Sequence, residues 1–444
     1  MRIKLSDHFT YSRTIRFVLP SIAMMIFTSI YYIVDGLFVS NIVGKTPFAA
    51  VNLIMPFLMI LGALGFMIGA GGSAVIAKTL GERKPELANE YFSMLVYITA
   101  AIGILITVLG LVFMHPIAVF LGARGQLLDD CILYGNINMI SMAPYMLQCV
   151  FQSFFIAAEK PKLGLGVTVA AGITNMVLDF LFIAVFGFGL AGAASATVTS
   201  EFVGGISALI YFGHKNNSLL QLTRSGFHGR IFLQTCFNGS SELVSEISVS
   251  FVGMIYNWQL LKFAGQDGVA AFGVMMYVNM IFMAIFFGYG MGIAPVVSYN
   301  YGARTHAELQ NLFRQSIRLM LGSGIALTLL AELLAKPLCS IFVGYDKDLL
   351  QLTLHGFHIL VFCFILMGFN VFGSNFFTAL NNGPVSAVIA LSRSFLFRAG
   401  LVMLLPIWLG LDGIWISAIV AELLSAIVTF AFIYSKRERY HYWP

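Results

Sequence analysis

The sequence predicts an all-α polytopic membrane protein, with twelve transmembrane helices arranged as two pseudo-symmetric six-helix lobes. The first observation behind this prediction is composition, because 59% of the 444 residues are hydrophobic and only 10% are charged. A soluble domain carries about 25% charged residues, so this chain could not cover a water-facing exterior. The other two observations are long apolar runs and an internal repeat.

The apolar runs predict the individual spans. A membrane core about 30 Å thick needs about 20 apolar helical residues. Runs of this kind have approximate limits of 14–40, 48–77, 88–113, 131–158, 163–186, 191–212, 231–260, 268–298, 312–334, 351–380, 385–407 and 411–434. Pro20, Pro144 and Pro295 lie inside runs, where we expect kinks.

Lys and Arg residues predict the orientation of these spans. Most of them lie in the N-terminus, in the C-terminus and in the connections that follow even-numbered runs, for example Lys84, Arg224 and Lys436. The opposite connections hold few, among them Lys262 and Lys347. By the positive-inside rule both termini are cytoplasmic, and the expected location is the inner (cytoplasmic) membrane.

The second half of the chain repeats the first half at an offset of 221 residues. The matching positions include Gly44 with Gly265, Arg83 with Arg304, Pro116 with Pro337, Gly189 with Gly410, and Glu201 with Glu422. The predicted units are an N-lobe at 1–213 and a C-lobe at 231–444, joined by a cytoplasmic linker at 214–230. Parallel repeats of this kind are typical of transporters, with the substrate path between the lobes. Duplication kept only for stability is the alternative.

Ionisable residues at membrane depth are the strongest candidates for function, because each costs about 2.5 to 3.5 kcal/mol there. Asp35 and Asp179 both fall in the outer half of the first lobe. Asn175 shares a helix face with Asp179, and Thr197 reaches a similar depth. Two carboxylates in a poorly hydrated pocket cannot both stay ionised cheaply, so we expect a bound proton or a Na⁺. The alternative is that Asp35 reaches the outer interface.

The other buried charges leave two interpretations open. Glu201 and Glu422 occupy equivalent positions, so each either bonds a neighbouring helix or faces a cavity. Glu242 and Glu246 match Arg398 in depth. They therefore form either a buried ion pair with that arginine or an acidic wall toward a cationic substrate. Some of the 41 Phe and 21 Met residues are expected to line a broad apolar cavity.

Enzymes and metal proteins are disfavoured. The +5 net charge is spread thinly, which gives no support to nucleic-acid binding. The five cysteines form no CxxC pair, and His355 and His358 have no third ligand spaced with them. The GAGGS run at 69–73 lacks the other parts of a phosphate loop, and no HExxH or GxSxG motif occurs. We therefore expect no catalysis, no cofactor and no metal.

Several motifs carry a resemblance to a known family. In the first half they are LPSIAMMIFTSIYYIVDGLFVSNIVG, GERKPELANE, AAEKPK, TNMVLDF and GLAGAASATVTSE; in the second half they are NWQLLKFAGQDGVAAFGVMMYVNM and GIAPVVSYNYGAR. With these motifs the chain resembles the MATE family, the multidrug and toxic compound extrusion transporters, over essentially its whole length.

The resemblance implies export of diverse, often cationic amphipathic compounds, coupled to inward H⁺ or Na⁺ flow by alternating access of two lobes. It implies a cation-coupling site formed by Asp35, Asn175, Asp179, Thr197 and Gln152, and a hinge at Pro20. Related members carry Asn where this chain has Gln152, and the longer amide leaves the coupling ion open. The family's second acidic site is only half present, because the run at 351–380 contains no acid.

The expected partners are small amphipathic substrates and the lipid bilayer, without nucleic acid or an obligate protein partner. The alternative function is that of a lipid-linked saccharide or lipid flippase of the same superfamily. Those relatives usually have fourteen spans and a strongly cationic cavity. This chain has twelve apolar runs and more acids than bases within them.

Overall fold

The computed structural model describes residues 3–443, and within them it contains helices and no strand. Residues 1, 2 and 444, at the ends of the two predicted lobes, lie outside the described residues. The α-helices are α1 (Tyr11–Phe38), α2 (Lys45–Gly81), α3 (Pro85–Phe120), α4 (Gln126–Met139), α5 (Met142–Ala157), α6 (Pro161–Asp179), α7 (Gly189–Gly213), α8 (Gly229–Gly302), α9 (His306–Val343), α10 (Lys347–Leu360), α11 (Phe364–Ala379), α12 (Gly383–Leu391), α13 (Phe397–Leu404) and α14 (Pro406–Tyr440).

Ten helical segments in the described range are long and apolar enough to cross a membrane, and the bent pair α4–α5 supplies an eleventh. The 74-residue helix α8 contains two spans, because Gly265 breaks it with φ 60° and ψ −149°. Glycine adopts such a conformation without steric cost. The prediction of an all-α fold with many spans is therefore confirmed.

Proline affects these spans unequally. Helices α4 and α5 form one span with a 58° bend between them, and Pro144 lies in the first turn of α5. Helices α1 and α8 instead continue through Pro20 and Pro295 without a break. A proline inside a helix removes one backbone hydrogen bond, so both positions keep a weak point in an otherwise continuous helix.

The 221-residue repeat is visible in the backbone. Gly189 and Gly410 have φ values of 57° and 58°, and Arg83 and Arg304 have φ values of 62° and 57°. A left-handed arginine is uncommon. Its occurrence at the end of the second span of each unit indicates that the same turn is built twice.

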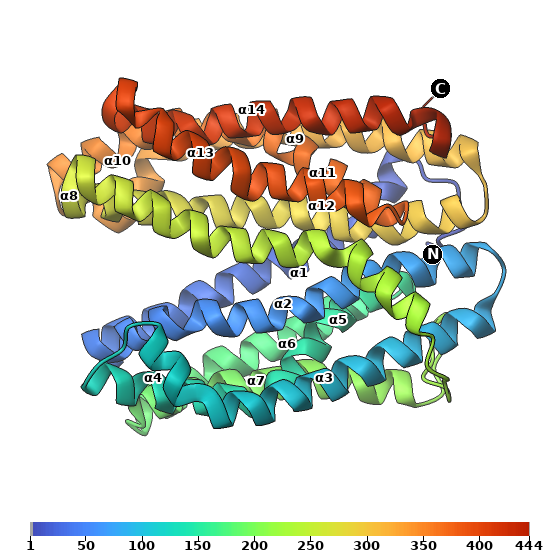
Figure 1. The fold of residues 1–444 in the computed structure, drawn as a ribbon, viewed down its shortest axis with the longest axis horizontal. Coiled ribbons are helices and arrows are strands. Elements are labelled where there is room, and N and C mark those ends of the chain that lie inside the picture. The colour runs from blue at the N-terminus through green and yellow to red at the C-terminus, as the bar shows by residue number, and fades with distance from the viewer. Residues whose placement is uncertain (1–2, 444) are drawn as a thin grey trace.

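The helices form two bundles that lie side by side (Figure 1). Helices α1 to α7 form one bundle and α8 to α14 form the other, and the first half of α1 packs against α8 at the boundary between them. Both chain ends lie at the same end of the molecule (Figure 1), as an even number of spans requires.

Close backbone contact joins the two bundles at this end. A Cβ atom on Gly302 would lie 2.1 Å from the carbonyl oxygen of Lys78, and one on Gly81 would lie 2.1 Å from that of Tyr299. No real Cβ atom tolerates such distances, so α2 and α8 approach each other here only because glycine has no side chain.

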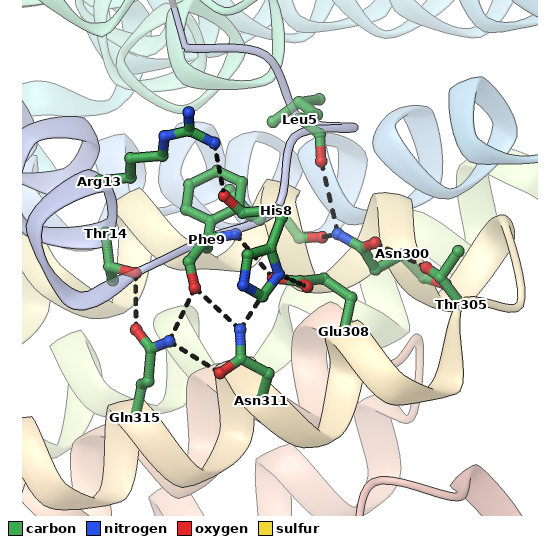
Figure 2. Close-up of polar contacts among 11 residues, drawn as sticks. Leu5, His8, Phe9, Arg13, Thr14, Asn300, Thr305, Glu308, Asn311 and Gln315 are labelled. Carbon is green, nitrogen blue, oxygen red and sulfur yellow. Dashed lines mark hydrogen bonds and ion pairs between the residues drawn. The ribbon is translucent and has the colours of Figure 1, made fainter.

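The N-terminal segment spans the same end of the molecule. We name residues 3–10 the N-terminal clasp, because its backbone is bound by side chains of both bundles. The Leu5 amide donates to Glu159 Oε1 at 2.8 Å, in the turn between α5 and α6. Figure 2 shows the other side, where the Phe9 amide donates to Glu308 Oε1 at 2.9 Å and the Phe9 carbonyl accepts from Gln315 Nε2 at 2.7 Å. The side chains of Leu5 and Phe9 are fully buried.

Candidate functional site

Two carboxyl groups meet inside the first bundle. Asp35 on α1 and Asp179 at the end of α6 are close enough to share a hydrogen bond. The residues are 6% and 0% exposed. Asp35 Oδ1 and both carboxylate oxygens of Asp179 have no hydrogen-bond donor among the described residues. Adjacent carboxylates repel each other when both are ionised, so this arrangement is suited to hold a proton or a small cation.

Matching helix faces bring the two acids together. Asp35 lies two turns after Phe27 on α1, and Asp179 lies two turns after Gly172 on α6. The ring of Phe27 would lie 2.4 Å from a Cβ atom on Gly172, so the helices touch there. The same two faces then meet again near Asp35 and Asp179. A π-helical segment follows each acid, at Val39–Val43 and at Phe180–Val185, and such segments are frequent at functional sites.

The remaining predicted site residues lie on α5, α6 and α7. Asn175 lies one turn before Asp179 and is 1% exposed, and its Oδ1 has no partner in the described part of the chain. Thr197 donates to the Ala193 carbonyl at 3.2 Å and lines a small cavity of about 20 Å³ with Glu201. Gln152, whose Oε1 is also without a described partner, lines the larger central cavity instead.

Three residues near this site were missed by the sequence analysis. Ser141, at the break between α4 and α5, donates a short hydrogen bond to the Glu201 carboxylate. Asn138 lines the small cavity beside Glu201, and buried Tyr134 lies within electrostatic range of Asp35, Asp179 and Glu201. The signal that could have found them is the polar spacing of Asn138 and Ser141 just before Pro144, since polar residues beside a helix break often face a site.

A central cavity of about 310 Å³ lies between the two bundles. The first bundle contributes residues of α1, α2 and α5, and the second contributes residues of α8 and α11. Glu242 and Glu246 line it, as one of the two interpretations from the sequence had it. The apolar part of the wall is rich in methionine and aromatic residues: Met25, Met59, Met283, Met291, Phe66 and Phe287.

The expected ion pair of Glu242 or Glu246 with Arg398 is wrong. Arg398 Nη2 instead lies 3.0 Å from Glu422 Oε1, and Arg393 Nη1 lies 3.6 Å from the same atom. The physical reason is that equal depth does not specify helix face. Glu242 and Glu246 point into the space between the bundles, whereas Arg398 points toward α14 within one bundle.

The two candidate histidines each face a single acid. His355 Nε2 lies 2.7 Å from Asp412 Oδ1, and His358 Nδ1 lies 2.5 Å from Glu332 Oε2. Within residues 3–443 no group of three or more His, Cys, Asp and Glu side chains is arranged to hold a metal ion.

Curated relatives match this chain along nearly its whole length. The multidrug export protein MepA of Staphylococcus haemolyticus (strain JCSC1435) is 23% identical over 434 residues, which cover 97% of this chain and 94% of the relative. MepA of Staphylococcus aureus (strain MSSA476) is 22% identical over 433 residues, with the same coverage.

Solved structures share the fold. One is described as the outward-facing conformation of a multidrug resistance MATE family transporter of the MOP superfamily; its TM-score is 0.92 at 23% identity, with 97% of each chain covered. MATE in the straight conformation has a TM-score of 0.92 at 22% identity, again with 97% of each chain covered. MATE in the bent conformation has a TM-score of 0.89 at 23% identity, covering 98% of this chain and 97% of that one.

The family match repeats within the chain. The MatE family model matches residues 20–181 and again residues 243–404, so each half of the chain contains one copy. These two segments make up most of the 444 residues. The chain therefore belongs to the MatE family of multi-pass membrane transporters, which confirms the resemblance found in its sequence.

Proposed function

We propose that this protein is a secondary antiporter that exports diverse, often cationic amphipathic compounds in exchange for H⁺ or Na⁺. The observation that carries the proposal is the pair Asp35 and Asp179, buried, adjacent and without a basic partner in the described residues. When a site of this kind releases its ion, the two carboxylates are left to repel each other. Ion occupancy can therefore shift the balance between two arrangements of the surrounding helices.

The cation-coupling site in this proposal consists of Asp35, Asp179 and Asn175, with Thr197 and Gln152 beside it. Ion entry from outside would relieve the repulsion and favour one arrangement of α1 and α6. To move a two-state equilibrium from 1:99 to 99:1 takes roughly 5.5 kcal/mol. The membrane potential contributes about 2.3 kcal/mol per charge per 100 mV, so ion binding and the potential together are of sufficient size.

Alternating access in this proposal is a movement of the predicted lobes, 1–213 and 231–444. The bundles touch through Gly81 and Gly302 at the end that carries both termini, which we place in the cytoplasm. The central cavity would then open outward in the present arrangement. Pro20 is the proposed hinge, because it weakens α1 between the closed end and Asp35.

The linker at 214–230 would act as a short tether in this movement. The Gln221 amide donates to Asn89 Oδ1 at 2.7 Å, and the Thr223 amide donates to Ser93 Oγ at 2.8 Å. Both acceptors lie on α3, so half of the linker is fixed to the first bundle. His228, directly before α8, is also held on α3: its amide donates to Met94 Sδ at 3.1 Å, and its Nε2 lies 3.3 Å from Glu90 Oε2. The tether would therefore be fixed to the first bundle up to the start of α8.

The walls of the central cavity support a cationic, amphipathic substrate. Glu242 and Glu246 supply negative charge, and flexible methionine side chains adapt to ligands of different shape. The lining includes no Lys or Arg among the described residues, which does not favour the flippase alternative. The MepA relatives are named multidrug export proteins, which agrees with this substrate class.

Ethidium efflux from energised membrane vesicles tests the proposal. Asp35→Asn and Asp179→Asn should each reduce gradient-driven efflux at least tenfold. Neither variant keeps two adjacent carboxylates, so the repulsion that drives release of the bound ion is lost. Asp129→Asn is the matched control, since Asp129 is exposed in the first turn of α4. Imposed H⁺ and Na⁺ gradients, applied separately, identify the ion. Undiminished efflux in both site variants would eliminate the coupling site.

A further inference from the structure

A second pocket lies within the bundle of α8 to α14. It has a volume of about 320 Å³ and shares Val249, Met280 and Met283 with the lining of the central cavity, so the two spaces adjoin. This volume falls within the usual range of small-molecule sites, about 300 to 1,000 Å³. One part of its wall is cationic, formed by Arg393 and Arg398.

Two guanidinium groups share one carboxylate in this wall. Arg393 is 6% exposed, and both it and Arg398 approach the same atom, Glu422 Oε1, at 3.6 and 3.0 Å. The other oxygen of Glu422 accepts from Asn370 Nδ2 at 2.7 Å. Glu242 also lies within electrostatic range of Arg393, but it lines the central cavity and forms no ion pair within 4.0 Å in the described residues.

The uncharged neighbours do not complete the hydrogen bonding of the two arginines. Tyr256 shares a 2.8 Å hydrogen bond with Ser417, and Cys363 is a buried thiol. Arg398 Nε has no acceptor in residues 3–443, and the Arg393 guanidinium has none within 3.5 Å there. A guanidinium carries five N–H donors, and leaving them unmet in a buried place is unfavourable.

The rest of the pocket is apolar and aromatic. Tyr256 and Phe272 stack with ring centroids 5.0 Å apart, and Met276 and Tyr277 complete this side. A ligand with a flat ring and one acidic group matches both parts of the wall: the ring would lie against the aromatic side chains, and the acidic group would accept from the free guanidinium donors.

We infer that this pocket binds the anionic group of an amphipathic substrate, with an aromatic carboxylate as the simplest ligand. Arg393 and the free Nε of Arg398 donate to the carboxylate, and the aromatic side chains hold the ring. The inference deepens the proposed function, on which its biological meaning rests, because it adds acidic and zwitterionic compounds to the substrates. In a zwitterion, the cationic end would extend toward Glu242 and Glu246 in the adjoining cavity.

Binding of 1-naphthoate to the purified full-length protein in detergent, measured by equilibrium dialysis, tests the inference. The cation of the same shape, 1-naphthylmethylammonium, is the matched probe. Arg393→Gln removes one guanidinium and leaves the 3.0 Å pair of Arg398 with Glu422 in place. We expect the Kd for 1-naphthoate to rise at least tenfold in Arg393→Gln, to rise less than threefold in Arg393→Lys, and to stay unchanged in the exposed control Arg318→Gln.

A second variant tests the pocket without changing its charges. A Cβ atom on Gly253 would meet no atom within 4 Å, so Gly253→Leu fills the space without a backbone clash. It should also raise the Kd for 1-naphthoate at least tenfold, which decides the matter if Arg393→Gln does not fold. Equal affinity for the two probes, or an affinity for 1-naphthoate that neither variant changes, overturns the inference. Ethidium efflux and its loss in Asp35→Asn test the proposed function independently of this result.

Discussion

Glu201 and Glu422 hold equivalent positions in the two halves of the molecule, yet their surroundings differ. Glu422 is 1% exposed and is bound by Arg398, Arg393 and Asn370. Glu201 receives one hydroxyl hydrogen bond, from Ser141. A buried acid that is paired with arginine side chains holds neighbouring helices together, whereas a buried acid without a basic partner can bind a proton or another cation.

The same contrast extends to the other charged positions. At the 221-residue offset, Asp35 corresponds to Tyr256 and Asp179 to Gly400, so the second half carries no acid at either place. Arg398 corresponds to Val177, so the first half lacks that base. At these positions one ancestral arrangement has therefore diverged into a half with two adjacent acids and a half in which two guanidinium groups share one carboxylate. A shared fold therefore does not require a shared electrostatic role.

The largest effect on stability is expected from Glu422→Gln. It removes the carboxylate that both Arg393 and Arg398 contact, and breaking a buried ion pair typically costs about 3 to 5 kcal/mol. Thermal unfolding of the purified protein measures the loss. The matched variant is Glu201→Gln, where the amide oxygen still accepts from Ser141 and the change should stay within about 1 kcal/mol. Equal losses in the two variants would contradict the contrast between the halves.

An intermediate effect of opposite sign is expected from Asp179→Asn. The variant replaces one of two adjacent carboxylates by an amide that can donate to Asp35, so repulsion is exchanged for a hydrogen bond. The free energy of unfolding should increase by about 1 to 2 kcal/mol while ion-coupled efflux is lost, as expected where function requires an unfavourable site. Thermal unfolding in detergent, with Asp129→Asn as the control, measures the change. A loss of stability in Asp179→Asn would show that the pair is structural.

The sequence predicts those features of the structure that depend on membrane depth and helical periodicity. Apolar runs predicted the spans, and the four-residue separation of Asn175 and Asp179 predicted a shared helix face, because helix geometry alone determines both. It could not choose the partner of Arg398, since Glu242 and Glu422 both lie at a compatible depth. It also missed Ser141, whose position depends on the 58° bend between α4 and α5. Bends and side-chain directions arise from tertiary packing, which a single sequence does not display.

The smallest effect is expected at the N-terminal clasp. The clasp is bound by both bundles, and the proposed transport requires that the bundles move apart. Glu308 binds the clasp twice, through the Phe9 amide at 2.9 Å and through His8 Nδ1 at 2.6 Å (Figure 2). Glu308→Gln keeps an acceptor for one of these bonds and loses the charge, which should cost about 1 kcal/mol. The remaining contacts of Leu5 and Phe9 should keep the clasp folded on average.

Hydrogen exchange at the Leu5 and Phe9 amides measures this change directly. A loss of about 1 kcal/mol corresponds to roughly fivefold faster exchange at Phe9 in Glu308→Gln. Because Leu5 is held by Glu159 in the other bundle, its amide should exchange faster as well only if the clasp opens as one unit. Glu438→Gln is the control, since the Glu438 side chain is 88% exposed. Faster exchange at Phe9 alone would mean that each bundle holds its own part of the clasp, and the clasp would then place no restraint on their separation.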